Sequence, residues 1–169
     1  MWSQSDDWKD ESRKRAVVVL SNNAGKSQTK PQVAVNKMLD RLSVLYENEA
    51  SFDYYAVDNY LSNYNLIIEV MGDYWHSSPL KYPECKNDKQ RHIVARDKAK
   101  HTYIKKHYGI EILYLWESDI LKNADLCEGL IMSYIKNNGV LGNYNSFNYV
   151  LEEGVPILVN DLVKSHQEE

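Results

Sequence analysis

The hydrophobic residues of this 169-residue chain are gathered in short runs separated by polar segments. Three such runs follow one another between residues 43 and 71: SVLYENE, SFDYYAVDNYL and NLIIEVM. The first two alternate and are rich in β-branched and aromatic residues, which predicts strands. The third is almost continuously apolar, which predicts a central strand buried on both faces. IEILYLW, residues 110–116, predicts one more buried strand.

Helical patterns lie before and after these strands. PQVAVNKMLDRL has helical periodicity and begins with Pro31, a residue favoured at the start of a helix. KNDKQRHIVARDKAKHTYIKKHYG predicts a long helix that Gly109 ends. One or two short helices are expected within residues 117–139. This order of elements indicates an α/β fold, with a small mixed sheet flanked by helices.

The two ends of the chain have weaker patterns. Residues 1–30 are expected to be a lead-in with a short helix, and their AGKS stretch, which lacks the full phosphate-loop spacing, is interpreted as a linker. Residues 31–139 are expected to form the core. Residues 140–169 are expected to form a C-terminal extension that adds a strand or helix and frays at its end.

Composition narrows the class of protein. Hydrophobic residues make up 43% of the chain and charged residues 26%, which is typical of a globular protein. No apolar run approaches the roughly 20 residues of a membrane helix, and the polar N-terminus is not a secretory signal. The two cysteines, Cys85 and Cys127, are too few for a disulfide framework or a zinc cluster. We therefore expect a cytoplasmic protein without a membrane partner.

Basic residues are concentrated in one part of an acidic chain. The net charge is −4, yet residues 81–110 contain nine basic and three acidic side chains. A local basic patch attracts a phosphate backbone whatever the total charge, because screening acts over about 10 Å. The alternative for such a run is a solvated helix face. The residues expected to contact nucleic acid are Lys81, Lys86, Lys89, Arg91, Arg96 and Lys98.

Two acids stand at the ends of neighbouring predicted strands. Glu69 is the one charged residue of the central strand, where a buried carboxylate requires a cation or strong donors. Asp58 ends the preceding strand, and a hairpin turning around NYLSNYN brings the two acids to one edge of the sheet. Carboxylates and a backbone carbonyl suit Mg²⁺, for which Mn²⁺ can substitute. For either acid alone, a salt-bridged strand end is the favoured alternative.

A histidine and a third acid complete the candidate site. His76 follows Glu69 by seven residues, and a neutral imidazole can take a proton from water near neutral pH. In the long helix, Asp97 projects within roughly 40° of Ile93 and Ile104, so it is expected to point toward the sheet. Asp97 would orient the ring of His76. Lys100 and the other helix lysines are expected on other faces.

The corner GDYWH and the stretch VARDKAKHTYIKKHYGIEILYLWESDIL resemble the very short patch repair (Vsr) endonucleases and the related phage and intron homing endonucleases called EDxHD enzymes. The shared pattern is an acid at a strand end, a G-x-x-W-H corner, an R-D on a helix and a strand followed by W-E. It spans about residues 52–122. These families are small members of the PD-(D/E)xK nuclease fold, with a restriction-endonuclease-like core.

This resemblance implies roles for the candidate residues. Asp58 would bind the catalytic metal, and the backbone carbonyl of Val70 would be a second ligand. His76 would activate water with support from Asp97, and Glu69 fits the second acid of the wider pattern. Within the same corner, Trp75 is expected to be a packing anchor for His76, and Asp73 to cap the turn.

The chain also departs from the family pattern. Met71 stands where PD-(D/E)xK enzymes have lysine, so His76 must supply the base. The helix glutamate of the family falls near Gln32, for which Glu47 or Glu49 could substitute in space. Ser78 replaces a second histidine of the repair enzymes, and their zinc ligands are absent. These departures indicate the mobile-element branch, and with it the cytoplasm of a host cell.

The resemblance therefore implies a magnesium-dependent endonuclease that acts on double-stranded DNA, the catalytic domain of a phage or intron homing endonuclease. Cutting both strands would require a homodimer or two successive events, and further DNA-binding modules are expected in a longer chain. Two alternatives stay open. One is a restriction or repair endonuclease of the same fold, and the other is a catalytically inactive domain that binds nucleic acid.

Overall fold

The computed structural model describes residues 9–18, 28–78, 81–82, 84–140, 149–152 and 155–158. Residues 9–18 form a helix, and the AGKS stretch lies outside the described residues. The elements that follow are helix α2 (Lys30–Arg41), strands β1 (Glu47–Phe52), β2 (Tyr55–Leu61) and β3 (Leu66–Met71), helix α3 (Asp88–Tyr108), strand β4 (Leu113–Trp116), helices α4 (Glu117–Lys122) and α5 (Ala124–Lys136), and strands β5 (Tyr149–Glu152) and β6 (Val155–Leu158). The predicted order of helices and strands is confirmed.

The main sheet has four strands in the order β1-β2-β3-β4. β1, β2 and β3 pair antiparallel, and the hairpin predicted around NYLSNYN joins β2 to β3 through the pair Leu61↔Leu66. β4 lies parallel to β3, because α3 carries the chain back across the sheet between them. The predicted α/β class, a small mixed sheet flanked by helices, is therefore confirmed. In the C-terminal segment, β5 and β6 pair antiparallel as a separate two-stranded sheet.

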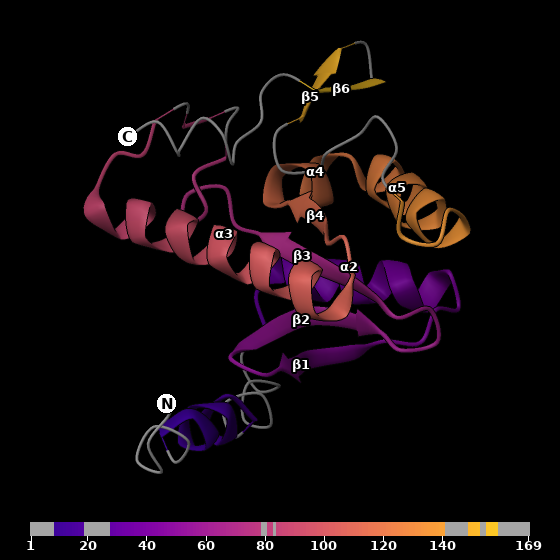
Figure 1. Cartoon of the computed structure of the whole chain (residues 1–169). Coiled ribbons are helices and arrows are strands. Elements are labelled where there is room, and N and C mark those ends of the chain that lie inside the picture. The colour runs from indigo at the N-terminus through magenta and orange to yellow at the C-terminus, as the bar shows by residue number, and fades with distance from the viewer. Residues whose placement is uncertain are drawn as a thin grey trace.

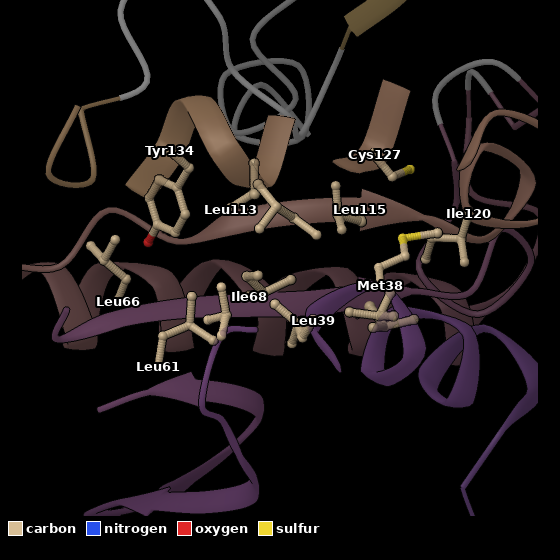
Figure 2. Close-up of a cluster of buried hydrophobic side chains, with 14 residues drawn as sticks. Met38, Leu39, Leu61, Leu66, Ile68, Leu113, Leu115, Ile120, Cys127 and Tyr134 are labelled. Atoms are coloured by element: carbon tan, nitrogen blue, oxygen red, sulfur yellow. The ribbon is translucent and has the colours of Figure 1, made fainter. Parts of the chain in front are cut away.

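Helices cover both faces of the main sheet (Figure 1). Helix α3 lies on one face, where Ile104 packs with Ile67, Met71 and Ile112. Helices α2, α4 and α5 cover the other face. Figure 2 shows the core on that face, to which both these helices and the strands contribute; it includes Met38, Leu39, Leu61, Leu66, Ile68, Leu113, Leu115, Ile120, Cys127 and Tyr134. Each residue of β3 and β4 is buried, as expected for strands covered on both sides.

Side chains and a glycine fix the ends of helices α2 and α3. Thr29 and Gln32 form a capping box at the start of α2, in which each side chain accepts a hydrogen bond from the other's backbone N–H. Asn87 caps α3. Gly109 ends α3 in the left-handed conformation, with φ 67°, as predicted.

The predicted boundaries of the first two strands were wrong. β1 begins at Glu47 rather than at residue 43, and residues 53–54 form the turn between β1 and β2. Asp53 has a positive φ of 56° in this turn, a conformation that Asn and Asp tolerate better than most residues. The alternation continued through the turn, so the pattern of apolar residues alone did not show it.

None of the helices within the described residues is long and apolar enough to cross a membrane.

Candidate active site

The candidate site lies where β2 and β3 separate. Their pairing is recorded from Leu61↔Leu66 to Asn59↔Ile68. One residue further along, the carboxylate of Asp58 enters the sheet instead, and its Oδ2 accepts a hydrogen bond of 2.7 Å from the backbone N–H of Val70. Asp58 thus takes the place of a backbone acceptor, and it is held against the strand that carries Glu69.

The backbone is irregular at the same level of the sheet. In β1, Glu49 has a positive φ of 52°, a costly conformation for a residue with a side chain. On one side of it, Ala50 packs in the core beneath α3, whereas Asn48 on the other side bonds Asn36 of α2. The alternation between faces therefore shifts at Glu49, directly opposite Asp58 in the register of β1 and β2.

The capping box of α2 also serves Asp58. The Oε1 atom of Gln32 accepts the N–H of Thr29 at 2.8 Å, which leaves the amide nitrogen of the same side chain available as a donor. That nitrogen donates to Asp58 Oδ1 at 3.0 Å. Gln32 thus contacts Asp58, to which it supplies a donor instead of a third acid.

Glu69 is paired with a cation that the sequence analysis placed elsewhere. Lys100 Nζ lies 2.7 Å from Glu69 Oε1, and the two side chains are only 17% and 10% exposed. The prediction that Lys100 points away from the sheet was wrong. Its position on α3 is only about 60° around the helix from Asp97, and its long flexible stem spans the remaining distance.

The electrostatics of this pair extend to the neighbouring acids. Burial raises the pKa of Glu69 to about 8, and the positive charge of Lys100 opposes this shift while Asp58 and Asp97 add to it. Burial by itself would lower the pKa of Lys100, but the same three carboxylates raise it overall. Lys100 is therefore the fixed positive charge among them.

Glu49 belongs to the same electrostatic group. Burial, and then the charge of Asp58, raise the pKa of Glu49, whereas Lys100 opposes the shift. Glu49 is thus the one of the two suggested substitutes for the helix glutamate that the structure brings to Asp58. Glu47 lies at the start of β1, where it is exposed and pairs with Tyr60 of β2.

His76 and Asp97 are in direct contact. Asp97 Oδ2 lies 2.6 Å from His76 Nδ1, and the side chains are 16% and 26% exposed respectively. Two backbone hydrogen bonds hold the corner that carries the histidine, from His76 N–H to the carbonyl of Gly72 and from Ser78 N–H to that of Asp73. If the Nδ1 hydrogen is donated to Asp97, the Nε2 atom of the ring is left as an acceptor. The catalytic roles of both residues stay predictions.

Asp73 links the corner to helix α4. Its Oδ1 accepts from the backbone N–H and the hydroxyl of Ser118, at 3.4 and 3.3 Å, and its own N–H donates to Glu117 at 3.1 Å. It therefore caps α4, which has no cap from its own N-cap residue. The expectation that Asp73 caps only its own turn was too narrow.

The expectation that Trp75 is a packing anchor was wrong. Its side chain is 48% exposed and meets the edge of Tyr74, with ring centroids 5.0 Å apart. The ammonium of Lys89 lies over the Trp75 ring, 4.5 Å from its centroid. Lys86 lies over Tyr82 in the same way, at 5.3 Å. A mixed aromatic and basic surface therefore adjoins His76.

The role of the six basic residues predicted to contact nucleic acid stays a prediction; they are Lys81, Lys86, Lys89, Arg91, Arg96 and Lys98. Lys81 lies 2.6 Å from Asp73, and Arg91 forms an exposed ion pair with Asp88. Arg96 is exposed and Lys98 half-buried on α3. Each of these side chains nevertheless lies on α3 or in the segment that leads into it.

The donors around Asp58 and Glu69 can be compared with the needs of Mg²⁺. Within the described residues, no group of three or more His, Cys, Asp or Glu side chains is placed to hold a metal ion. Mg²⁺ commonly keeps several waters and binds through one or two carboxylates. Both oxygens of Asp58 accept one hydrogen bond each, and each retains a further lone pair. These oxygen donors are therefore suited to Mg²⁺. Lys100 already compensates part of the negative charge of the carboxylates.

Comparison with known proteins gives one structural likeness. A search of solved structures finds the catalytic domain of the homing endonuclease I-Bth0305I, at a TM-score of 0.50 and 25% sequence identity. The match covers 66% of this chain and 98% of that domain. It supports a nuclease-like fold. No protein-family model matches the chain, and a search of curated proteins finds no match either.

Proposed function

We propose that this protein is a nuclease that hydrolyses phosphodiester bonds in double-stranded DNA, and that residues 31–139 are its catalytic core. The observation that carries the proposal is the hydrogen-bonded pair of His76 and Asp97. Asp97 lies on the same helix as Lys100, which bonds Glu69, and Asp58 is held beside Glu69 at Val70. The structural likeness to a homing endonuclease catalytic domain supports the same conclusion. The basic and aromatic surface beside His76 suits a phosphate backbone.

The reaction assigned to the site is hydrolysis by water. In its neutral form His76 accepts a proton from the attacking water through Nε2, while Asp97 holds the ring through Nδ1 and stabilises the imidazolium that forms. The water oxygen bonds to phosphorus, the bond from phosphorus to one ester oxygen breaks, and that oxygen leaves with a proton from solvent. Lys100 keeps positive charge beside the reacting anion, although Met71 occupies the usual lysine position.

We propose Mg²⁺, with Mn²⁺ as a substitute, as the cofactor. Asp58, Glu69 and the carbonyl of Val70 would hold it, and it would supply positive charge to the phosphate and make its bound water more acidic. The restricted set of two carboxylates implies that waters complete the coordination.

The finer assignment is the catalytic domain of a phage or intron homing endonuclease, similar to Vsr and EDxHD enzymes and with a PD-(D/E)xK core. The identity of the matched structure favours the homing branch over repair. The expected setting is the cytoplasm of a host cell. Double-strand cutting would come from a homodimer or from two successive events, and additional DNA-binding modules would belong to a longer chain.

A cleavage assay tests the proposal. Supercoiled plasmid and a linear duplex are incubated with the protein in Mg²⁺, Mn²⁺ or EDTA, alongside the variants Asp58→Asn and His76→Ala. We expect nicked or linear product with either metal, none in EDTA, and a loss of about 10²-fold or more in both variants.

Asp88→Asn is the matched control. Asp88 is on α3 like Asp97, but its side chain is 97% exposed and its recorded partner is Arg91, so its removal should leave cleavage unchanged. DNA binding without cutting in any divalent metal would instead identify a catalytically inactive nucleic-acid-binding domain. Strict cutting at a short sequence would identify a restriction enzyme.

A further inference from the structure

Helix α3 carries a second feature that the proposed catalytic site does not use. An open pocket of about 380 Å³ lies along it, between two rows of side chains spaced four residues apart. Lys98, Thr102 and Lys106 form one row, and Tyr103 and His107 belong to the other; Tyr55 of β2 closes one side. The lining thus combines two ammonium groups, a hydroxyl and an imidazole with aromatic walls.

The positive charge of Lys106 in the pocket differs from the charges of two other lysines on α3. Elsewhere on the helix, Lys100 pairs with Glu69 and Lys105 with Glu111. Lys106, by contrast, is exposed and has no carboxylate partner within the described part of the chain. Its charge is therefore available to a ligand.

The aromatic wall of the pocket is held in place from behind. Asp53, in the turn between β1 and β2, accepts hydrogen bonds of 2.8 Å from the hydroxyls of Tyr103 and Tyr108. The ring of His107 packs on that of Tyr103, with centroids 4.2 Å apart. The carboxylate of Asp53 is thus occupied by the hydroxyls of Tyr103 and Tyr108, and the imidazole of His107 is held at the pocket by its contact with Tyr103.

We propose that this pocket binds phosphates of the DNA backbone away from the cleaved bond. This inference rests on the proposed nuclease function. Lys98 directly follows Asp97, and Lys106 lies eight residues further along α3, a distance of about 12 Å at the rise of a helix. Since a strand of duplex DNA rises about 3.4 Å per nucleotide, a backbone that follows α3 would bring phosphates within about four nucleotides of the cleaved bond to the pocket.

Salt-dependent binding tests the proposal. The variants Lys106→Ala and Lys98→Ala, singly and together, are compared with wild type by titrating a labelled duplex in EDTA at several salt concentrations. Each phosphate contact contributes about 0.9 to the slope of log K against log salt. The slope should therefore become shallower by about 0.9 in each single variant and about 1.8 in the double variant.

Lys105→Ala is the matched control, because it removes the same charge from the neighbouring position on α3, outside the pocket and paired with Glu111. It should leave the slope unchanged. Equal effects of Lys105→Ala and Lys106→Ala, or no effect of the pocket variants, would overturn the proposal. Circular dichroism melting verifies that each variant is folded. Cleavage by wild type is measured in parallel. If wild type cuts DNA but the pocket variants leave the salt slope unchanged, only the pocket proposal is refuted. If wild type neither binds nor cuts DNA, the proposed function is refuted.

Discussion

At the scale of single residues, Lys100 is the side chain on which the site depends most. Its side chain is 17% exposed, and its Nζ lies 2.7 Å from Oε1 of Glu69, an atom with no other hydrogen-bond partner within the described residues. Replacing Lys100 with Met keeps the length of the stem and removes the charge. Wild-type Glu69 ionises above its pKa of about 8, whereas the variant has to keep it protonated, so we expect a loss of about 1–2 kcal/mol in the free energy of unfolding at pH 9, measured by urea denaturation.

The cost of Lys100→Met should depend on pH. A protonated Glu69 needs no cation, and without Lys100 its pKa rises above the wild-type value of about 8. The native state of the variant then binds a proton that the unfolded state releases above its ordinary pKa near 4.3, so the stability of the variant falls as pH rises from about 4 toward 8. The double variant Glu69→Gln with Lys100→Met should lose this dependence. Wild type shares this fall up to the Glu69 pKa of about 8, so the extra cost of Lys100→Met should appear only as the pH rises above about 8. An equal cost at pH 6 and pH 9 would contradict the assignment.

At the scale of elements, two glycines with positive φ end helices in different surroundings. Gly109 closes α3 with φ 67°, and a Cβ built there meets nothing within 4 Å. Gly139 follows α5 with φ 82°, and its Cβ would lie 2.5 Å from the side chain of Leu66 in β3. The first glycine is required only by backbone conformation, the second also by the closeness of α5 to the sheet.

Alanine variants at these glycines should therefore differ. Gly109→Ala is expected to cost about 1–2 kcal/mol for the left-handed conformation alone. Gly139→Ala carries the same cost and about 1–3 kcal/mol more for overpacking against Leu66. Urea denaturation of the two variants measures the difference. Equal losses would mean that Leu66 moves aside without cost.

The elements themselves were largely predictable, because each has a strong local pattern. The run LIIEVM could only be a buried strand or a buried helix, and its length favoured the strand. Gly109 gave the end of α3. The turn at Asp53 was missed because aromatic residues continue through it, and the side chains of Tyr103 and Tyr108 that bond Asp53 are far away in the sequence.

The site was predictable where backbone geometry alone sets the direction of a side chain. Helical periodicity turned Asp97 toward the sheet. The contact of Lys100 with Glu69 depends on a long flexible stem, and the exposure of Trp75 depends on what the fold leaves uncovered beside it. The spacing of residues along the sequence predicts neither this contact nor this exposure. The sequence placed Gln32 near the helix glutamate of the nucleases it resembles, but the hydrogen bond from Gln32 to Asp58 depends on how α2 packs on the sheet.

At the scale of the whole molecule, Tyr134 joins α5 to the two central strands. Its hydroxyl accepts the N–H of Ile67 at 3.2 Å and lies against the backbone carbonyls of Ile67 and Glu111. Burial raises the pKa of Tyr134, so the hydroxyl stays protonated. Ile67 in β3 is fully buried, and water cannot replace the lost partner there.

Tyr134→Phe should therefore destabilise the fold without altering the proposed site. Leaving buried backbone groups unsatisfied costs about 1–3 kcal/mol, visible as a lower urea midpoint with an unchanged m-value. Tyr134 lies on the face of the sheet covered by α2, α4 and α5, whereas Lys100 and Asp97 belong to α3 on the opposite face. Cleavage by the folded variant should thus equal that of wild type at temperatures below its unfolding transition. A loss of cleavage with no loss of stability would show that the two faces are coupled.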